Sequence, residues 1–216
     1  MTTFTETLGM RAGEFLVSEA NGHRSREHIL IPENQTLVAG QVLGKITTGA
    51  ATAGAVVGTG NGTMGAITLG KNAKPGVYTL RITEAAANAG AFEVTDPDGD
   101  VVGTGNVGSA FTSSHLSFTL ADGSTDFAAG ATIPITVAAG LGTYVPLAPS
   151  ATNGSQIAAA ILWEKRTTGA GETKRAVGIV RDAEFNADLI TWPEGISGGD
   201  KTTALAQLAA AGLTPR

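Results

Sequence analysis

The stretch RAVGIVRDAEFNADLITWPEGI, residues 175–196, is the part of the sequence against which we interpret the rest. Residues 176–180 form a short apolar run with an arginine at each end, which is typical of a strand buried on both faces. The polar residues that follow predict a break, and residues 189–192 predict a second strand. Pro193 ends that strand, because proline has no N–H to donate to a ladder. The stretch holds no obvious nucleophile or metal ligand, so we interpret it as a scaffold that positions Trp192 and Pro193.

Several segments of the chain resemble one known family. Residues 176–196, followed by an alanine-rich segment, resemble the C-terminal half of the head decoration proteins of lambda-like tailed bacteriophages. Residues 14–26, EFLVSEANGHRSR, are similar to the opening strand and turn of that family. The segments LGKIT (43–47) and TYVPL (143–147) are similar to two halves of one family segment, although almost a hundred residues separate them here. The resemblance covers roughly the first fifty and the last seventy-five residues and says nothing about the middle.

The resemblance implies a fold and a place of action. The fold is mainly β, with a base domain of bent, β-clip-like ribbons and a short C-terminal helix. We expect this base domain to be discontinuous, comprising residues 15–48 and 141–216, with residues 1–14 as a flexible N-terminal arm. The family's role implies a homotrimer that binds the major capsid protein on the outer surface of the expanded head. There it would stabilise the head against the pressure of packaged DNA.

The resemblance also indicates which residues make contacts. The resemblance implies that the arm adds a strand to a neighbouring chain, and the alternative is a frayed terminus. Phe4, Leu8 and Met10 are apolar residues of the arm. We therefore expect Phe4, Leu8 and Met10 to contact the capsid. Trp192 and Pro193 are expected either at an interface or in the core.

Residues 49–140 have a different composition, in which Gly, Ala, Thr and Asn dominate, and we expect them to form an inserted domain. Apolar and polar residues alternate strictly in the runs 78–83, 116–120 and 133–137. A period of two is typical of half-buried antiparallel strands, with one face inside and one outside. Pro134 predicts that the last of these runs lies at a sheet edge. With turn sequences between them, about six or seven short strands predict an antiparallel β-sandwich or a small barrel.

Local signals predict a hairpin, a bent ribbon and one helix. The Asn-Gly pair at residues 21–22 predicts a hairpin. Gly40 and Gly44 suit a sharply bent ribbon, which needs a positive φ or a close backbone approach. Asp200 is a good N-cap for a helix over residues 201–211. This helix would carry leucines on one face and be followed by a glycine that ends it.

Composition excludes several classes of protein. The chain has 216 residues, enough for one domain or two small ones with a real core. Its formal net charge of -5 argues against direct nucleic-acid binding, which needs a basic surface. There are no cysteines for disulfides or Cys-based zinc sites, and no apolar run approaches the ~20 residues of a membrane span. The N-terminus lacks the features of a signal peptide, so we expect synthesis in the host cytoplasm and no contact with a membrane.

Motifs for cofactors and metals are weak. Residues 103–108 match a dinucleotide fingerprint, but no helix is predicted after them to receive the pyrophosphate. Residues 96–100 are spaced like the start of a calcium loop, but the glycine comes too early and no glutamate closes the loop. A hairpin turn fits that segment better. His23 and His28 do not have the metalloprotease spacing, so we expect no cofactor and no metal.

Three classes of function remain open. The first is the capsid decoration protein described above, whose inserted domain projects outward and, as one guess, binds a surface glycan or cell. The second is a β-sandwich adhesin or carbohydrate-binding module on a cell or virion surface. The third is a hydrolase, for which Asp182 and Glu184 are the candidate acid pair, two residues apart on one face of a strand. No companion acid or cleft is indicated near this pair, so we expect the first function and not an enzyme.

Overall fold

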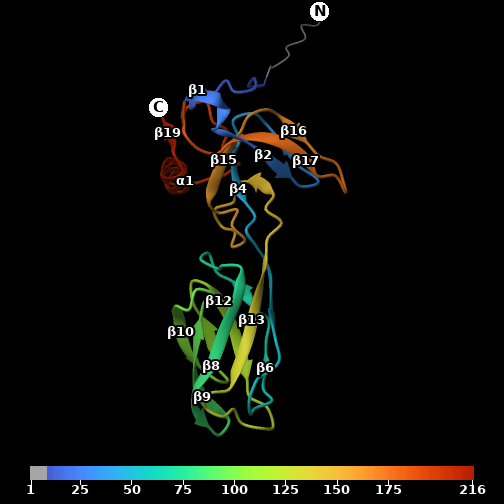
Figure 1. The fold of residues 1–216 in the computed structure, drawn as a ribbon, viewed down its shortest axis with the longest axis vertical. Helices are drawn as coiled ribbons and strands as arrows, with labels where there is room; N and C mark the ends of the chain where they lie inside the picture. Colours follow the sequence, from blue (N-terminus) through green and yellow to red (C-terminus); the bar gives the residue numbers. More distant parts are fainter. Residues whose placement is uncertain (1–8) are drawn as a thin grey trace, which may run out of the picture. The chain divides into compact units, whose positions relative to one another are not determined.

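The computed structural model describes residues 9–216, which divide into two compact units (Figure 1). The described part of unit 1 comprises residues 9–46, 142–151 and 155–216, and unit 2 comprises residues 47–141 and 152–154. The short last segment belongs to unit 2 because the carbonyl of Asn153 accepts hydrogen bonds from the N–H groups of Thr47 and Thr48, at 2.8 and 3.1 Å. Both units are built mainly of β-strands, which confirms the expected fold class.

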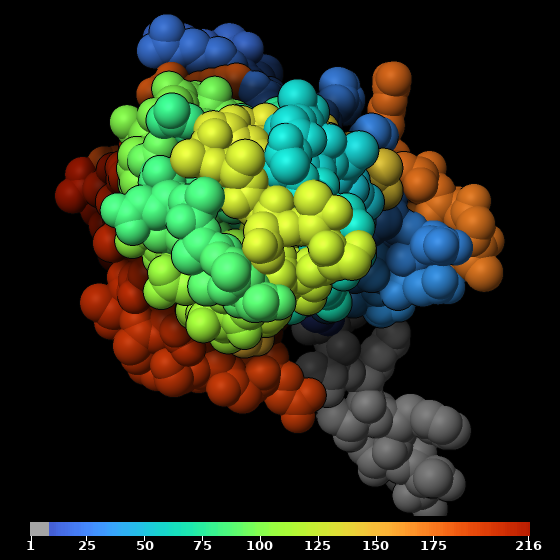
Figure 2. All heavy atoms as spheres, turned by 90° about the horizontal axis from the view of Figure 1, so that it is seen from below, coloured from blue at the N-terminus to red at the C-terminus, as the bar shows by residue number. Residues whose placement is uncertain are grey.

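Unit 2 contains two antiparallel sheets whose strands come from all along its sequence. The five-stranded sheet has the order β10 (Val101–Asn106), β9 (Ala89–Thr95), β8 (Gly76–Ala86), β13 (Thr132–Ala139) and β5 (Thr48–Ala53). The second sheet has the order β11 (Ala110–Thr112), β12 (Leu116–Ala121) and β6 (Thr63–Met64), and β7 (Thr68–Leu69) also pairs with β12. Figure 2 shows segments from the early, middle and late parts of unit 2 side by side on one continuous surface.

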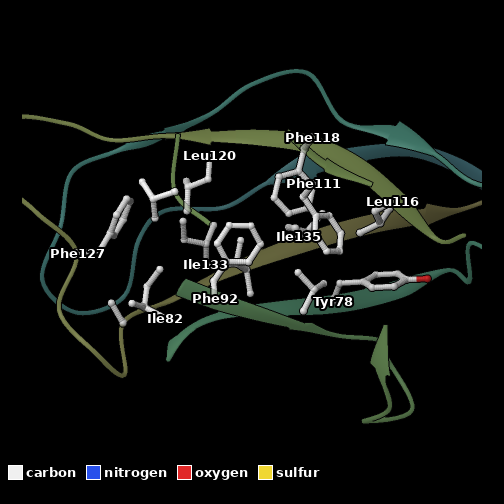
Figure 3. Packing of buried hydrophobic residues seen from close by; sticks show 14 of the residues in the cluster. Tyr78, Ile82, Phe92, Phe111, Leu116, Phe118, Leu120, Phe127, Ile133 and Ile135 are labelled. Carbon is white, nitrogen blue, oxygen red and sulfur yellow. The ribbon is translucent and has the colours of Figure 1, made fainter. Parts of the chain in front are cut away.

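The two sheets of unit 2 face each other across one apolar core (Figure 3). Tyr78, Leu80 and Ile82 are buried on one face of β8, while the residues between them are not, as the period of two predicted. From the second sheet, Phe111 and Phe118 pack on each other with ring centroids 4.9 Å apart. The arrangement is therefore a sandwich, in which alternation along each strand decides which side chains point inward.

The prediction that Pro134 marks a sheet edge is wrong. β13 is an interior strand, with β8 on one side and β5 on the other. In an extended strand the N–H and C=O of one residue point to the same side, and the carbonyl of Pro134 accepts from the N–H of Gly54 at 2.7 Å. The last paired residue of β5 is Ala53, opposite Ile135. The proline nitrogen thus falls beyond the end of β5, where no ladder partner is needed.

Unit 1 contains two sheets, a short strand pair and an α-helix. The five-stranded sheet has the order β14 (Tyr144–Pro146), β4 (Val42–Lys45), β15 (Ala158–Leu162), β17 (Lys174–Ile179) and β2 (Arg26–Ile31). The three-stranded sheet has the order β1 (Leu16–Glu19), β18 (Ala183–Phe185) and β19 (Leu213–Pro215). The remaining elements are the pair β3 (Thr36–Leu37) and β16 (Arg166–Thr167), the 3₁₀ turn η1 (Asn21–His23) and the helix α1 (Gly198–Ala210). Within residues 9–216, no helix has the length and apolar character that a membrane span requires.

The five-stranded sheet of unit 1 has an apolar cluster on each face. Val42 and Leu43 are neighbours on β4 and point to different clusters, as successive residues of a strand must. Leu43 joins the inner cluster, which includes Ile29 of β2. Val42 joins the outer cluster, which includes Phe15 and Leu208 of α1. The three-stranded sheet and the helix therefore cover part of the outer face.

Gly40 and Gly44 behave as predicted. Gly40 has a φ of 74°, in the left-handed region that favours glycine. A Cβ at Gly44 would overlap the backbone of Ser155, so the chain packs there too closely for any side chain. On the next strand, Val145 of β14 lies opposite Gly44, so the residues before and after unit 2 pair with each other.

Two strand predictions in the C-terminal part are wrong. β18 forms where we predicted a polar break, because β1 pairs with it on one side and β19 pairs parallel to it on the other. Residues 189–192 form no strand where we predicted one. The side chain of Asn186 accepts the N–H of Asp188 at 2.9 Å, which turns the chain, and only Thr191 makes an isolated bridge, with Gln41.

The predicted hairpin at residues 21–22 and the predicted helix cap are also wrong. β1 and β2 belong to different sheets, and the Asn-Gly pair lies in η1, which leads from one sheet to the other. The helix begins at Gly198, earlier than predicted, and its N-cap is Ser197, whose Oγ accepts the N–H of Asp200 at 3.1 Å. Asp200 lies in the first turn, where a carboxylate favours the helix dipole. Gly212, with a φ of 84°, follows the helix as predicted.

Candidate interaction surfaces

Two of the three apolar arm residues, Phe4 and Leu8, lie outside the described residues. The third, Met10, is half-buried and packs against the outer cluster of unit 1. A Cβ at Gly40 would lie 2.7 Å from the sulfur of Met10, so the absence of a side chain at Gly40 makes room for it. A capsid contact by Met10 stays a prediction; within this chain the side chain packs on unit 1.

Trp163 fixes the first residues of the described chain. The N–H of Gly13 donates to the carbonyl of Trp163 at 2.9 Å, and Gly13 has a φ of 68°. A Cβ at Gly13 would overlap the indole ring, so only glycine lets the backbone lie against it. Phe15 packs edge-on against the same ring, with centroids 6.5 Å apart. Gly13 is therefore held against Trp163, and Met10 packs beside Gly40.

Arg26 of β2 also packs on Trp163, with its guanidinium carbon 3.9 Å from the ring centroid. A cation over an aromatic ring at this distance is attractive. The same guanidinium donates two hydrogen bonds to the carboxylate of Glu19, at 2.9 and 2.7 Å, and His23 Nδ1 lies 2.9 Å from that carboxylate. The hydrogen bond from Arg26 holds the pKa of Glu19 below its ordinary value, and His23 adds to the effect. Glu19 thus holds the guanidinium in place over the indole.

The outward face of β2 and β17 is apolar and basic. Because opposite residues of an antiparallel pair share a face, Leu30 lies beside Arg175 and His28 beside Val177. Leu30 is 42% exposed, and Arg175 and His28 are exposed as well. Among the described residues, neither Arg175 nor His28 has a side-chain partner. We call this surface the basic face; it consists of Arg26, His28, Leu30, Trp163, Arg175 and Val177.

A second surface of unit 1 carries the opposite charge. Asp188 and Glu194 are exposed, and neither carboxylate has a partner in the part of the chain that the structure describes. Leu189, which follows Asp188, is 38% exposed. The nearest base on the helix, Lys201, lies with its Nζ 6.0 Å from the ring centroid of Trp192. We call residues 188–194 the acidic segment.

Trp192 and Pro193 lie within the acidic segment and are both half-buried. Trp192 packs against the outer cluster of unit 1. The backbone of Thr191 holds the segment in place, because its N–H donates to the carbonyl of Gly40 at 2.9 Å and its carbonyl accepts from Val42 at 3.1 Å. A role of Trp192 and Pro193 at an interface stays a prediction; Trp192 packs on the core, and Pro193 is half-buried.

One family covers both units of the chain. The family described as "Bacteriophage lambda head decoration protein D" matches residues 3–213. The chain belongs to this family. The match confirms the resemblance of the separate segments and extends it across the middle of the chain.

No curated protein matches this phage head decoration protein. Among solved structures, two crystal forms of Xanthomonas campestris FlgL match with 19% and 21% sequence identity, and each has a TM-score of 0.31. The matches cover 48% and 49% of this chain and 33% of FlgL. The chain thus spans about a third of the length of the solved chains it matches, and a likeness at this level carries no argument about function.

The two candidate acids of the decoration protein do not lie on one strand. Asp182 lies in the turn before β18 with a φ of 48°, so the prediction that it shares a strand with Glu184 is wrong. Arg24 Nε lies 3.8 Å from the carboxylate of Asp182. Arg216 Nε donates to Glu184 at 3.0 Å and lowers the pKa of that carboxyl. A general acid needs a raised pKa, whereas the pKa of Glu184 is lowered.

The decoration protein also has a polar hollow in unit 2. The buried carboxylate of Asp96 accepts the N–H groups of Asp98 and Asp100 at 2.9 and 3.0 Å, which makes the predicted hairpin turn. Lys74 Nζ lies 2.5 Å from Asp96 and 2.6 Å from Asp98, so an ammonium supplies the positive charge to this turn. It lowers the pKa of Asp96, and its own pKa is raised. A hollow of about 490 Å³ lies beside it, with lining residues that include Asn72, Asp100, Ser114 and His115.

Sequence reasoning missed both charged surfaces of unit 1. The alternation of Arg26, His28 and Leu30 has the period of two that marks one strand face, so half of the basic face carried a local signal. The other half, Arg175, becomes its neighbour only through the register of β2 and β17. The packing of Gly13 on Trp163 carried no local signal, because the two residues are distant in the sequence.

Proposed function

We propose that this phage head decoration protein binds the outer surface of the expanded capsid as a homotrimer and stabilises the head against internal DNA pressure. The observation that supports this most is the family match over residues 3–213. A protein that binds only the expanded lattice lowers the free energy of that lattice and so opposes its rupture. Its partner in this proposal is the major capsid protein, and its synthesis takes place in the host cytoplasm before assembly.

The arm that contacts the shell comprises residues 1–14 in this proposal, with Phe4, Leu8 and Met10 as its apolar contacts. The packing of the arm's last residues on Trp163 supports the assignment, because it gives the arm a fixed origin. Ordering a chain segment costs conformational entropy, so one arm alone binds weakly. Three arms on one trimer raise the effective concentration of the second and third contacts, and avidity then replaces single-site affinity.

The two units have separate roles in the proposal. Unit 1 is the base domain that seats on the shell, since the separate segments whose own sequence resembles the family lie in it, although the family match spans both units. Unit 2 is an inserted module that displays its surface to the solvent. Its polar hollow offers amide, hydroxyl and carboxylate groups, which are the groups that hydrogen-bond sugar hydroxyls, so we propose a surface glycan as its ligand. On a glycan array, the chain should bind a defined set of sugars, and Asp100→Asn should weaken that binding.

Cosedimentation with expanded, undecorated heads of the same phage tests the main proposal. We expect the chain to pellet with expanded heads and not with unexpanded ones, and decorated heads to resist heating better than bare heads. A chain that lacks residues 2–9 should pellet less at the same concentration, because the arm contacts are gone. A full-length chain that stays in the supernatant with expanded heads, at concentrations well above that of the lattice sites, would refute the proposal.

The chain catalyses no reaction in this proposal. The arginine that donates to Glu184 supports this, because it lowers the pKa of that carboxyl, whereas a general acid needs a raised pKa. Substrate screens for glycoside and ester hydrolysis should show no turnover above that of the buffer. Turnover that disappears in Glu184→Gln would instead favour the hydrolase hypothesis.

A further inference from the structure

The basic face is an unusual surface for a chain whose net charge is -5. The acids that border it, Glu19 and Glu27, are already bound by arginines. Arg175 and His28 therefore remain without a partner among the described residues, next to the exposed side chain of Leu30. An arginine without a partner beside exposed apolar side chains is typical of protein interfaces, in which arginine is enriched.

The packing of unit 1 explains why this face is open. The outer cluster, which contains Phe15 and residues of α1, covers the five-stranded sheet at the Ile179 end of β17. Arg175 lies nearer the other end of that strand, opposite Leu30, and both side chains are exposed within residues 9–216. A hollow of about 310 Å³ lies between this area and the covered end, with Trp163 and Val177 in its lining. The basic face thus combines a hollow beside Trp163 and Val177 with the exposed side chains of Leu30 and Arg175.

The acidic segment has the complementary composition. Asp188 and Glu194 are both exposed and unpaired within residues 9–216, and Leu189 adds an exposed apolar side chain between them. Leu189 lies in a groove with Arg11 and Glu14, whose charges cancel. The segment therefore offers two unpaired carboxylates, one on each side of apolar residues. The unpaired side chains of the basic face, in contrast, are basic.

One copy of the chain does not bring the two surfaces together. The acidic segment runs beside Gly40 and Val42, at the start of β4. β15 separates β4 from β17, which carries Arg175, so the strands nearest the two surfaces lie on the order of 10 Å apart at about 4.8 Å per strand. No ion pair joins them within the described chain. Their charges must be satisfied by solvent or by another chain.

We propose that the acidic segment of one copy docks on the basic face of a second copy of this chain. Asp188 and Glu194 then meet Arg175 and His28, and Leu189 packs near Leu30. The contact joins unlike surfaces head to tail, so repeated contacts either close a ring or continue as a filament. The inference rests on the homotrimer of the proposed function, which requires that the head-to-tail contacts close into a ring.

Unique cysteines provide the first test, because the chain has none of its own. The variants Arg175→Cys and Glu194→Cys are mixed in equal amounts on expanded heads and treated with a short bismaleimide. We expect cross-linked dimers from the mixture and only traces from either variant alone. A mixture of Arg175→Cys with Arg81→Cys, an exposed position of unit 2, is the matched control and should not cross-link. Equal cross-linking within single variants, or none in the mixture, would overturn the head-to-tail contact.

Charge reversal provides the second test. Arg175→Glu and Glu194→Arg should each weaken self-association, measured by sedimentation equilibrium, by about tenfold or more. One chain that carries both changes should recover most of the loss, because every contact regains opposite charges. Arg81→Glu reverses an exposed charge of unit 2 and should leave association unchanged. If both single variants fold, as judged by circular dichroism, and the double variant does not recover, the proposal is wrong.

The proposed function and this inference fail in different ways. If the unchanged chain does not bind expanded heads, the proposed function fails. If it binds them, and the charge-reversed variants bind and associate no differently, the head-to-tail contact fails and the proposed function stands. If copies associate neither in solution nor on heads, both fail.

Discussion

Unit 2 and unit 1 bury their apolar residues in different ways. In unit 2 one cluster fills the space between two sheets, and the rings of Phe92, Phe111 and Phe118 pack within it at centroid distances of 4.9 to 6.0 Å. In unit 1 two smaller clusters lie on the two faces of one sheet. The charges are divided unequally as well, because the chain has 14 lysines and arginines and those of unit 2 are only Lys71, Lys74 and Arg81.

In unit 2 the fold follows from simple alternation of apolar and polar residues. In unit 1 some apolar and charged side chains stay exposed, where they could contact a partner. A sandwich encloses the inner faces of both sheets, and all the phenylalanines of unit 2 are buried between them. A single sheet with a cluster on each face cannot be covered completely by three short strands and one helix. Leu30 and Leu189 remain exposed beside unpaired charges in unit 1, which is the composition of a binding surface.

The largest effect on stability is expected from removing one large side chain from the core of unit 2. Phe92 is fully buried against Phe111 and Phe118, so Phe92→Ala should lower the free energy of unfolding of unit 2 by about 3–5 kcal/mol. The apolar clusters of the two units are separate, so calorimetry should show the transition of unit 1 unchanged. Thr79→Ala, on the outward face of the same sheet, should change stability by about 0.5 kcal/mol or less. An equal loss in both transitions would show that the units do not unfold independently.

A smaller effect, confined to unit 1, is expected at Gly44. Gly44→Ala places a methyl group against the backbone of Ser155, so β4 and the neighbouring loop must move apart. We expect a loss of about 1–3 kcal/mol in the transition of unit 1, with unit 2 unchanged. The control is Gly199→Ala in the helix, where the nearest atom is Ser197 Oγ at 3.8 Å and the change should be neutral or slightly stabilising. Similar melting temperatures of the two variants would mean that Gly44 and the backbone of Ser155 are not so close in solution.

The packing of the arm's origin should show a more local effect. Gly13→Ala combines a left-handed φ with overlap of the Trp163 ring, whereas Gly22→Ala has a φ of 75° but open space around it. Both variants carry about 1–2 kcal/mol of backbone strain, and only Gly13→Ala should also displace the chain from the indole. Hydrogen exchange should therefore become faster at residues 10–13 in Gly13→Ala alone. Equal exchange in the two variants would show that backbone strain, and not contact with Trp163, controls the segment.

The smallest effect is expected from pH, and only in unit 2. The pKa of Asp96 lies below its ordinary value of 3.8 because Lys74 donates to it. A lowered pKa stabilises the fold above that ordinary value, and the contribution is lost as the pH falls below it. Lys74→Met removes the cause, so the acid unfolding midpoint of unit 2 should move to higher pH. Arg81→Met, which breaks an exposed pair with Glu93, is the control, and the same shift in both variants would contradict the role of Lys74.

The two units also differ in how far the sequence predicts them. In unit 2, the alternation at Leu116, Phe118 and Leu120 predicts burial correctly, because each strand's pattern is local. Pro134 misled us because its tolerance depends on where a different strand ends. In unit 1, β18 forms only because β1 and β19 pair with it, and neither partner is near it in the sequence. Local sequence patterns therefore predict little of the packing of unit 1.

The interaction surfaces follow the same rule. Trp192 and Pro193 were identified from a local run, and both lie at the surface of unit 1, although the strand expected to hold them is absent. Met10 was identified as apolar, but its packing beside Gly40 required the fold. The charge complementarity between Arg175 and Glu194 required the sheet order, because it depends on which residues stay uncovered.

The hydrogen bonds at the two ends of unit 2 have a consequence for how such proteins diversify. Ile46 donates to the carbonyl of Thr143 at 2.9 Å and accepts from Gly142 at 3.0 Å. The ladder of β4 and β14 thus stays closed up to the points where the chain departs and returns, about 4.8 Å apart. A tight turn can connect two strand ends at this distance, and so can an inserted module whose own ends lie next to each other. Another module inserted at this point would leave the β4–β14 ladder of unit 1 unchanged.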